Sequence, residues 1–208
     1  EIPALLGNDN KIRSLKNYLN DFDPSTLIFE KINKIKTLNA KTLPEISSDI
    51  RIGSCISNPE KFIGIGLNFS DHAAEQGLPI PKEPIVFAKA TSSIIGPYDD
   101  VIIPSKSNKT DWEVEIAFVV GKKAKNVSQQ NASNYILGYC IVDDVSEREW
   151  QKERGGQWTK GKSADTFGPI GPYLVTQDEI PDVQNLNMYL EINGKRMQTG
   201  NTSKMIFK

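Results

Sequence analysis

The sequence has few of the residues that support several common kinds of chemistry. It contains one histidine and two cysteines in 208 residues. Cys55 and Cys140 stand far apart, without the close spacing of a metal or redox motif. Sparse, widely separated cysteines are typical of a reducing compartment, so we expect a cytoplasmic location and small core cysteines. The longest uninterrupted apolar run, 116–120, has five residues, which is too few to cross a bilayer.

The sequence also lacks an excess of charge of either sign. Lys and Arg number 25, Asp and Glu number 26, and the net charge is −1. Nucleic acids and anionic membranes attract strongly basic surfaces, so neither is an expected partner. With 38% hydrophobic and 25% charged residues, the composition is that of a folded protein. The length indicates one large domain, or a small domain joined to a larger one.

The first 58 residues differ in residue pattern from the rest, and we expect them to form a small N-terminal accessory domain. Two short strands, 3–7 and 12–15, are followed by a polar helix over 24–36 with apolar residues at helical spacing. The segment has no tryptophan. Residues 57–60 form a turn-prone linker, and residues 59–208 then form the second domain.

Short strands dominate the predicted second domain, so we expect a mixed α+β fold that is mostly β. The predicted strands lie at 62–66, 84–89, 101–104, 112–121, 139–142 and 186–192, the last followed by an Asn-Gly hairpin turn. The predicted helices lie at 70–76, at 128–137 and from Ser146, where Glu149 would complete a capping box. Residues 203–208 resemble the start of an apolar element, so we expect this domain to be truncated at its C-terminal end.

Two glutamates in the strand 112–121 are candidate metal ligands. Glu113 and Glu115 are two residues apart in a strand, so their side chains share one face, with Cα atoms about 6.6 Å apart. Both faces become apolar beyond Glu115, so we expect the strand to be covered on both sides. Packed without a cation, the two carboxylates would repel each other. The alternative is an edge strand with a solvated polar face.

A third carboxylate follows the apolar strand 140–142, where Asp143 and Asp144 stand side by side. An all-oxygen set of two Glu and one Asp selects Mg²⁺, Mn²⁺ or Ca²⁺ over Zn²⁺. The alternative is that the aspartates serve the turn and the N-terminus of the following helix.

The single histidine, His72, precedes Glu75 by three residues, and a short helix places both on one face. A carboxylate beside an imidazole suits a general base that activates water. The alternative is a surface histidine in a first helical turn.

Residues 156–163 match the phosphate-loop pattern GxxxxGKS, but a charged segment precedes them and Gly168-Pro169 would end any following helix. A phosphate-loop nucleotidase is therefore a weak alternative. The loop either presents Lys162 to a site or lies in solvent.

Several motifs in this order resemble the fumarylacetoacetate hydrolase family. The resemblance extends from Lys61 to the last residue and is carried by residues 66–75, 111–115, 143–149, 158–163 and 167–169. It implies a distorted β-sandwich or roll that holds a divalent ion, usually Mg²⁺. The N-terminal segment resembles the small domain of many bacterial members, and a homodimer is implied as well.

The resemblance also implies roles for individual residues. The matched positions are Glu113, Glu115 and Asp144 for the metal ligands, with Asp143 as the closest competitor; His72 and Glu75 for the water-activating pair; Lys162 for the lysine that stabilises developing negative charge; and Lys89, Arg148 and Gln151 for the substrate site. The implied activity is hydrolysis of a carbon–carbon bond in a small 2,4-dioxo (acylpyruvate-type) acid, with release of pyruvate. A lyase such as one acting on ureidoglycolate, an isomerase or a decarboxylase on the same site, and a non-catalytic binding module remain open.

Overall fold

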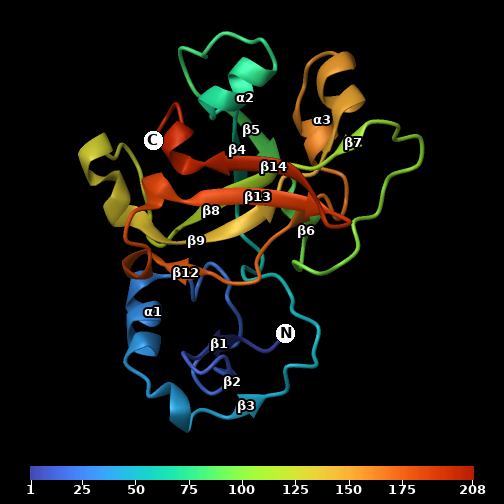
Figure 1. The fold of residues 1–208 in the computed structure, drawn as a ribbon. Coiled ribbons are helices and arrows are strands. Elements are labelled where there is room, and N and C mark those ends of the chain that lie inside the picture. Colours follow the sequence, from blue (N-terminus) through green and yellow to red (C-terminus); the bar gives the residue numbers. More distant parts are fainter.

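Residues 1–58 lie at one end of the molecule, as the computed structural model of residues 1–208 shows (Figure 1). They form a three-stranded antiparallel sheet and two short helices. These elements are β1 (Ala4–Leu6), β2 (Ile12–Ser14), α1 (Phe29–Lys36), η1 (Ala40–Thr42) and β3 (Glu45–Ile46). The two predicted strands are confirmed, but the helix begins five residues later than predicted. The reason is that the Asp23 carboxylate accepts hydrogen bonds from the backbone of Ser25 and Thr26 and forms a separate turn there.

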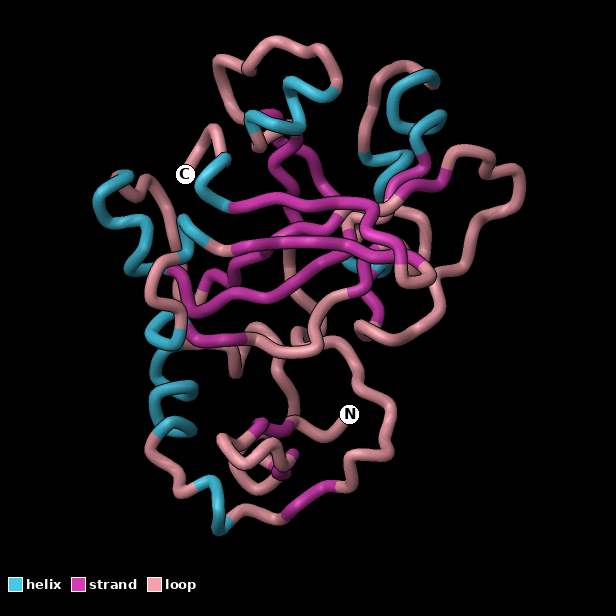
Figure 2. Tube along the Cα trace, viewed as in Figure 1, coloured by secondary structure: helices cyan, strands magenta, loops and turns pink.

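The central sheet of the rest of the chain is antiparallel, with strand order β12-β9-β8. It comprises β8 (Val114–Val120), β9 (Ile136–Asp143) and β12 (Val175–Thr176). Two further antiparallel strand pairs and four short strands surround it (Figures 1 and 2). One pair joins β4 (Phe62–Gly66) to β5 (Ile85–Lys89) across the connection 67–84. The other is the hairpin of β13 (Asn187–Ile192) and β14 (Lys195–Asn201). The remaining strands are β6 (Ile94–Ile95), β7 (Thr110–Asp111), β10 (Ser146–Glu147) and β11 (Gly168–Pro169).

Helices in residues 59–208 are few and short, so the mixed, mostly β class is confirmed. The α-helices are α2 (Ser70–Glu75) and α3 (Thr159–Lys162), and η4 (Glu149–Glu153) is a π-helix. The 3₁₀ helices are η2 (Thr91–Ser93), η3 (Gln129–Tyr135), η5 (Gln177–Glu179), η6 (Val183–Asn185) and η7 (Thr202–Lys204). None of the helices has the length and apolar composition needed to cross a membrane.

Three predicted elements differ in the structure. Residues 101–104 form no strand, because the backbone of Ile102 donates to the Thr166 hydroxyl instead of to a neighbouring strand. Residues 129–135 form a 3₁₀ helix, and β9 already begins at Ile136. Ser146 does not cap a helix: it pairs with Asp111 in a two-stranded ladder, and its hydroxyl donates to the carbonyl of Asp144.

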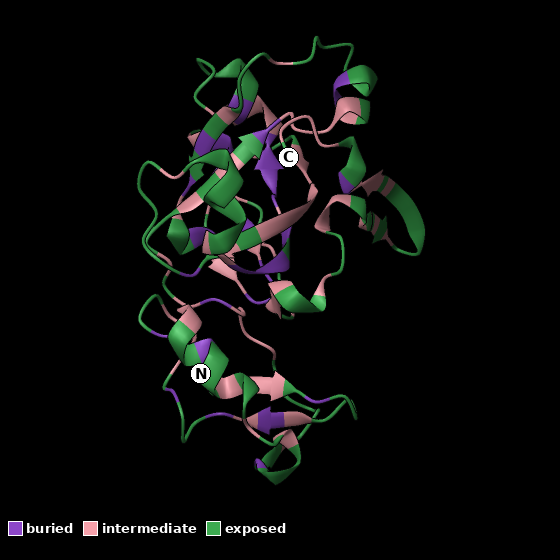
Figure 3. Ribbon diagram, turned by 90° about the vertical axis from the view of Figure 1, so that its left-hand side faces the viewer, coloured by how far each residue is buried: buried purple, intermediate pink, exposed green.

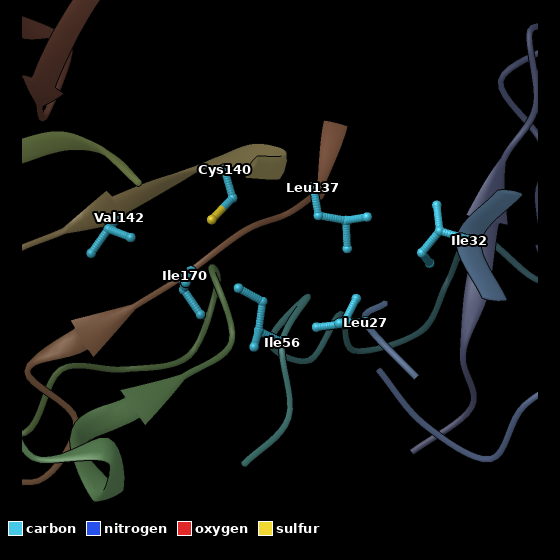
Figure 4. Close-up of a cluster of buried hydrophobic side chains, with 7 residues drawn as sticks. All are labelled: Leu27, Ile32, Ile56, Leu137, Cys140, Val142 and Ile170. Carbon is cyan, nitrogen blue, oxygen red and sulfur yellow. The ribbon is translucent and has the colours of Figure 1, made fainter. Parts of the chain in front are cut away.

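The main hydrophobic core joins residues 1–58 to the central sheet. Its buried residues, drawn in Figure 4, are Leu27, Ile32, Ile56, Leu137, Cys140, Val142 and Ile170. The first three come from residues 1–58 and the others from β9 and the segment after β11. Burying side chains of this size contributes about 1.5–3 kcal/mol each. A smaller cluster of Leu15, Leu19 and Leu43 lies within residues 1–58. The domain boundary at 58/59 stays a prediction.

One face of β8 is less covered than predicted. Ala117 and Val119 pack against the main core, but Phe118 and Val120 on the opposite face are 58% and 51% exposed. The β13–β14 hairpin contacts β8 at its start, where the backbone nitrogen of Val114 donates to Gln198. Buried residues therefore lie along the central sheet, while the outer loops are exposed (Figure 3).

Candidate functional site

Three acidic side chains come together at one end of the central sheet. Glu113 precedes β8, Glu115 lies within it, and Asp144 directly follows β9. The backbone nitrogen of Asp144 donates to the carbonyl of Glu113 at 2.8 Å, so the two strand ends are held side by side. The ladder pairs Glu115 with Val142 and continues up to Asp143. Residues far apart in sequence thus present carboxylates from adjacent rigid strands.

Three cationic side chains neutralise two of these carboxylates. Lys162, at the end of α3, contacts Glu113 and lies 2.5 Å from Oδ2 of Asp144. Lys89, at the end of β5, lies 2.7 Å from Oδ1 of Asp144. Arg148 Nη2 lies 2.6 Å from Oε1 of Glu113. Lys89 and Lys162 are only 4% and 2% exposed, so this is a buried charge network in which each ammonium depends on its carboxylate partners.

Glu115 has no cationic partner, and this separates it from Glu113. Burial raises the pKa of Glu115, and the carboxylates of Glu113 and Asp144 add to this effect, bringing it to about 8. Burial acts in the same direction on Glu113, but Lys162 and Arg148 outweigh it and lower the pKa of Glu113 to about 2. The site therefore holds an ionised glutamate beside one that is protonated near neutral pH.

Asp143 and Asp144 face different groups. Asp143 Oδ1 accepts a hydrogen bond from the backbone nitrogen of Glu113 at 3.0 Å, and burial raises its pKa. Asp144 faces the two lysines instead. The side chain directed into the charge network is thus that of Asp144, while Asp143 holds the start of β8.

Arg148 connects Glu113 to Asp111, a residue with no predicted role. Its Nε donates to Asp111 at 2.8 Å and its Nη1 donates to Gln151 at 3.0 Å. Gln151 is 1% exposed. Asp111 is the first residue of the Asp-Trp-Glu-Val-Glu run, which carries part of the family resemblance. Its place in that run was the sequence signal that could have assigned it to the site. Lys89, Arg148 and Gln151 all border the network, and their role in substrate binding stays a prediction.

Gly161 explains why Lys162 reaches this network. A Cβ atom at Gly161 would lie 2.5 Å from the carbonyl oxygen of Glu147 and 2.6 Å from the nitrogen of Gln151. Only glycine lets α3 pack this closely on β10 and η4. The same geometry argues against a phosphate loop, because η4, not a strand, precedes the motif and carboxylates hold the Lys162 ammonium.

His72 and Glu75 lie on α2, apart from the carboxylates. His72 Nδ1 is 3.6 Å from Oε2 of Glu75, whose side chain is 80% exposed. A shorter contact, 2.6 Å, joins His72 Nε2 to the carboxamide nitrogen of Gln76. No hydrogen bond or ion pair joins His72 or Glu75 to Glu113, Asp144 or their cationic partners. The structure thus groups the predicted metal, lysine and substrate residues, and leaves the predicted water-activating pair on a neighbouring helix.

The donor set suits a hard divalent cation, although no three His, Cys, Asp or Glu side chains are arranged around a common metal position. Lys162 stands between Glu113 and Asp144 instead. Glu115 lacks a cation, and Asp144 Oδ1 is buried without a hydrogen bond of favourable geometry. A cation bound by these three carboxylates would relieve both features.

Residues 61–208 match the family model described as Fumarylacetoacetate (FAA) hydrolase C-terminal. The chain belongs to the fumarylacetoacetate hydrolase family. Members of this family are enzymes that generally use a divalent metal. A Burkholderia lata protein named as a hydrolase is 54% identical over 207 residues, which are 100% of this chain and 73% of that protein.

Two solved structures show the same fold. Fumarylacetoacetate hydrolase from Exiguobacterium antarcticum is 27% identical, with a TM-score of 0.84 over 97% of this chain and 72% of that one. The 2-hydroxyhepta-2,4-diene-1,7-dioate isomerase from Mycobacterium marinum is 29% identical, with a TM-score of 0.71 over 99% of this chain and 76% of that one. The predicted family is confirmed, while the sandwich or roll arrangement stays a prediction.

Proposed function

We propose that this protein is a divalent-metal-dependent hydrolase that cleaves a carbon–carbon bond in a small 2,4-dioxo acid of the acylpyruvate type. Pyruvate and a carboxylic acid are the products. The proposal rests on membership of the family and on one observation, the clustering of three carboxylates, two of which pair with buried lysines. The expected ion is Mg²⁺, with Mn²⁺ or Ca²⁺ as substitutes, and the expected assembly is a cytoplasmic homodimer.

In this proposal, Glu113, Glu115 and Asp144 hold the metal ion. The ion supplies positive charge that polarises the oxygens of the substrate and stabilises negative charge developing on them. Glu115 carries a proton near neutral pH when it lacks a cation, so binding the ion requires this proton to leave.

The substrate carboxylate is bound by groups around Arg148. Its guanidinium presents several N–H donors in a fixed plane, a geometry that matches a carboxylate. Glu113, Asp111 and Gln151 hold that plane from three directions. Lys89 adds a second buried positive charge next to Asp144. The site is therefore suited to a small organic acid.

The hydrolytic step begins at His72. Its imidazole accepts a proton from water, and the water oxygen attacks the carbonyl carbon distal to the carboxylate, C4. The C3–C4 bond then breaks, and its electron pair stays on C3 as the enolate of pyruvate, which is afterwards protonated. The Lys162 ammonium stabilises the negative charge that develops in this step. General-base catalysis by a group such as His72 typically contributes about 10²- to 10⁴-fold to the rate. Charge stabilisation by Lys162 therefore supplies a further part of the rate enhancement.

An isomerase on the same site is the second candidate. The observation in its favour is the structural similarity to the Mycobacterium marinum isomerase across nearly the whole chain. Such a reaction also forms an enolate-like anion beside a lysine, but His72 would move a proton between carbon atoms instead of activating water.

Metal binding is the first test, and Asp143 supplies a matched control. We expect isothermal calorimetry to detect Mg²⁺ or Mn²⁺ binding to the full chain, and Asp144→Asn to weaken it more than tenfold. Asp143→Asn should retain binding, because Asp143 faces the backbone of Glu113. The reverse pattern would shift the ligand to Asp143, and no binding by the parent protein would overturn the metal proposal.

The reaction is tested with a substrate panel. Acylpyruvates, 2-hydroxydienedioates, ureidoglycolate and nucleotides are incubated with the protein and Mg²⁺, and products are identified by mass spectrometry. We expect pyruvate and an acid from acylpyruvates. Isomerisation of the dienedioate without pyruvate formation would support the second candidate and exclude the first.

A further inference from the structure

Gln76 contacts side chains on two different elements. Its carboxamide nitrogen lies 2.6 Å from His72 Nε2, and its carboxamide oxygen accepts a hydrogen bond from Lys152 Nζ at 3.4 Å. Gln76 directly follows α2, and its backbone nitrogen donates to the carbonyl of His72, so the side chains of residues 72 and 76 lie one above the other. Lys152 belongs to η4, the helix that also carries Gln151.

The chemistry of Lys152 determines which way the Gln76 carboxamide points. An ammonium group has only donors, so the atom facing Lys152 must be the carboxamide oxygen. The carboxamide NH₂ group therefore faces His72. That group also has only donors, so His72 Nε2 must accept and must carry its lone pair on this side.

The tautomer of His72 follows from this orientation. A neutral imidazole with a lone pair on Nε2 carries its proton on Nδ1. Nδ1 is the nitrogen that faces Glu75 at 3.6 Å. Both neighbours thus favour the same tautomer: Glu75 lies on the side with the proton, and Gln76 donates to the side without it. Nε2 is the nitrogen able to take a proton from water.

Gln76 also links the base to another element of the site. The Gln76–Lys152 contact is the one side-chain hydrogen bond between residues 70–77 and η4. The same helix contains Gln151, which is bonded to Arg148 beside the carboxylates. The hydrogen bonds His72–Gln76–Lys152 therefore link Nε2 of His72 to η4, the helix that carries Gln151.

We propose that Gln76 is a positioning residue: its carboxamide, oriented by Lys152, keeps the proton of His72 on Nδ1 and reserves Nε2 as the base. The role of His72 as base rests on the proposed function, but the tautomer does not. In this arrangement a water molecule must replace the Gln76 amide at Nε2 before it can be activated.

The single histidine makes this tautomer directly measurable. In protein labelled with ¹⁵N-histidine, a long-range ¹H–¹⁵N correlation spectrum shows one imidazole, that of His72. At a pH where the ring is neutral, we expect the Nδ1–H form. Gln76→Glu places a group that only accepts opposite Nε2, so we expect the proton on Nε2 or a doubly protonated ring. Gln129→Ala, an exposed glutamine on η3, is the control and should leave the spectrum unchanged.

Lys152 provides a second, independent variant. Lys152→Met removes the group that orients the carboxamide, and we expect the spectrum to become a mixture of both tautomers. Lys125→Met, an exposed lysine without an ion pair, should retain the parent spectrum. An Nε2–H tautomer in the parent, or an unchanged tautomer in Gln76→Glu, would overturn the proposal.

Kinetics separate this inference from the proposed function. We expect Gln76→Ala to lower kcat roughly 10- to 100-fold, the usual range for groups that orient a reacting side chain, with KM and Mg²⁺ affinity close to the parent values. The expected tautomers without turnover of any dioxo acid would refute the function and retain the inference. Turnover by the parent together with an unchanged tautomer in Gln76→Glu would refute the inference and retain the function.

Discussion

The carboxylate network and the histidine helix are built in opposite ways. Glu113 and Asp144 lie at the ends of core strands, and the lysines between them are almost completely buried. His72 lies on a six-residue helix in which only Ala73 is buried, beside the 80% exposed Glu75. Groups of like charge stay together only where rigid strands and buried cations hold them. A group that exchanges protons with water needs access to solvent. The comparison predicts that changes in the network affect folding, while changes at the helix affect turnover.

Removing the cation between the carboxylates should have the largest effect. Lys162→Met leaves Glu113 and Asp144 without their shared ammonium, and we expect the free energy of unfolding to fall by about 3–5 kcal/mol. Denaturant titration in the presence of a chelator measures this. Lys160→Met, two residues away on the exposed side of α3, is the control and should cost less than about 1 kcal/mol. A loss below 1 kcal/mol for Lys162→Met would show that the network is not buried as described.

Glu115 should produce an effect that depends on pH. Its pKa is about 8 in the folded protein against a usual value of 4.5, so the folded state binds an extra proton between these pH values. Stability therefore falls as pH rises through this window, by up to about 1.4 kcal/mol per pH unit. Glu115→Gln removes this dependence. In chelator, we expect the variant to match the parent near pH 5 and to exceed it in stability at pH 8.

The metal proposal adds a control for Glu115. Excess Mg²⁺ at pH 8 should raise the melting temperature of the parent and leave that of Glu115→Gln almost unchanged. Equal pH dependence in both proteins would contradict the raised pKa.

A smaller loss of stability is expected at Gly161. In Gly161→Ala the added Cβ meets backbone atoms of Glu147 and Gln151, which cannot move without displacing η4 and β10. We expect a loss of about 1–3 kcal/mol, because the clash strains the backbone and shifts Lys162 away from Glu113 and Asp144. Gly200→Ala is the matched control, since no atom lies within 4 Å of its added Cβ. If both variants unfold at the same denaturant concentration, α3 does not pack on η4 as closely as described.

The smallest effect on stability should come from His72. We expect His72→Asn to change the free energy of unfolding by less than about 0.5 kcal/mol and to leave Mg²⁺ affinity intact. Turnover should nevertheless fall by roughly 10² or more, because the group that accepts the proton is gone. Turnover near that of the parent would exclude His72 as the base. It would also contradict the expectation that changes on α2 act on turnover.

Local patterns predicted much of the fold, and their failures share one cause. The alternation around Glu113 and Glu115, the α2 helix and the Asn193-Gly194 hairpin turn all depend on near neighbours in sequence, and the structure contains each of them. Ser146 shows the opposite case. Ser146 and Glu149 match a local capping box. In the structure, Ser146 instead pairs with Asp111, 35 residues earlier, and forms a strand there. Gln76 was missed although it stands four residues after His72, the spacing at which helical side chains meet.

The sequence by itself determined the family, the three candidate carboxylates and the side of the strand on which two of them lie. These follow from residue types, their order and a two-residue period, which need no knowledge of distant contacts. Only the tertiary structure decided that Lys162 stands between Glu113 and Asp144, that Asp144 and not Asp143 faces it, and that Gln76 joins His72 to Lys152. These contacts span 49, 18 and 76 residues. Such partners are selected by packing and by the cost of leaving a buried charge alone, and neither can be read from local spacing.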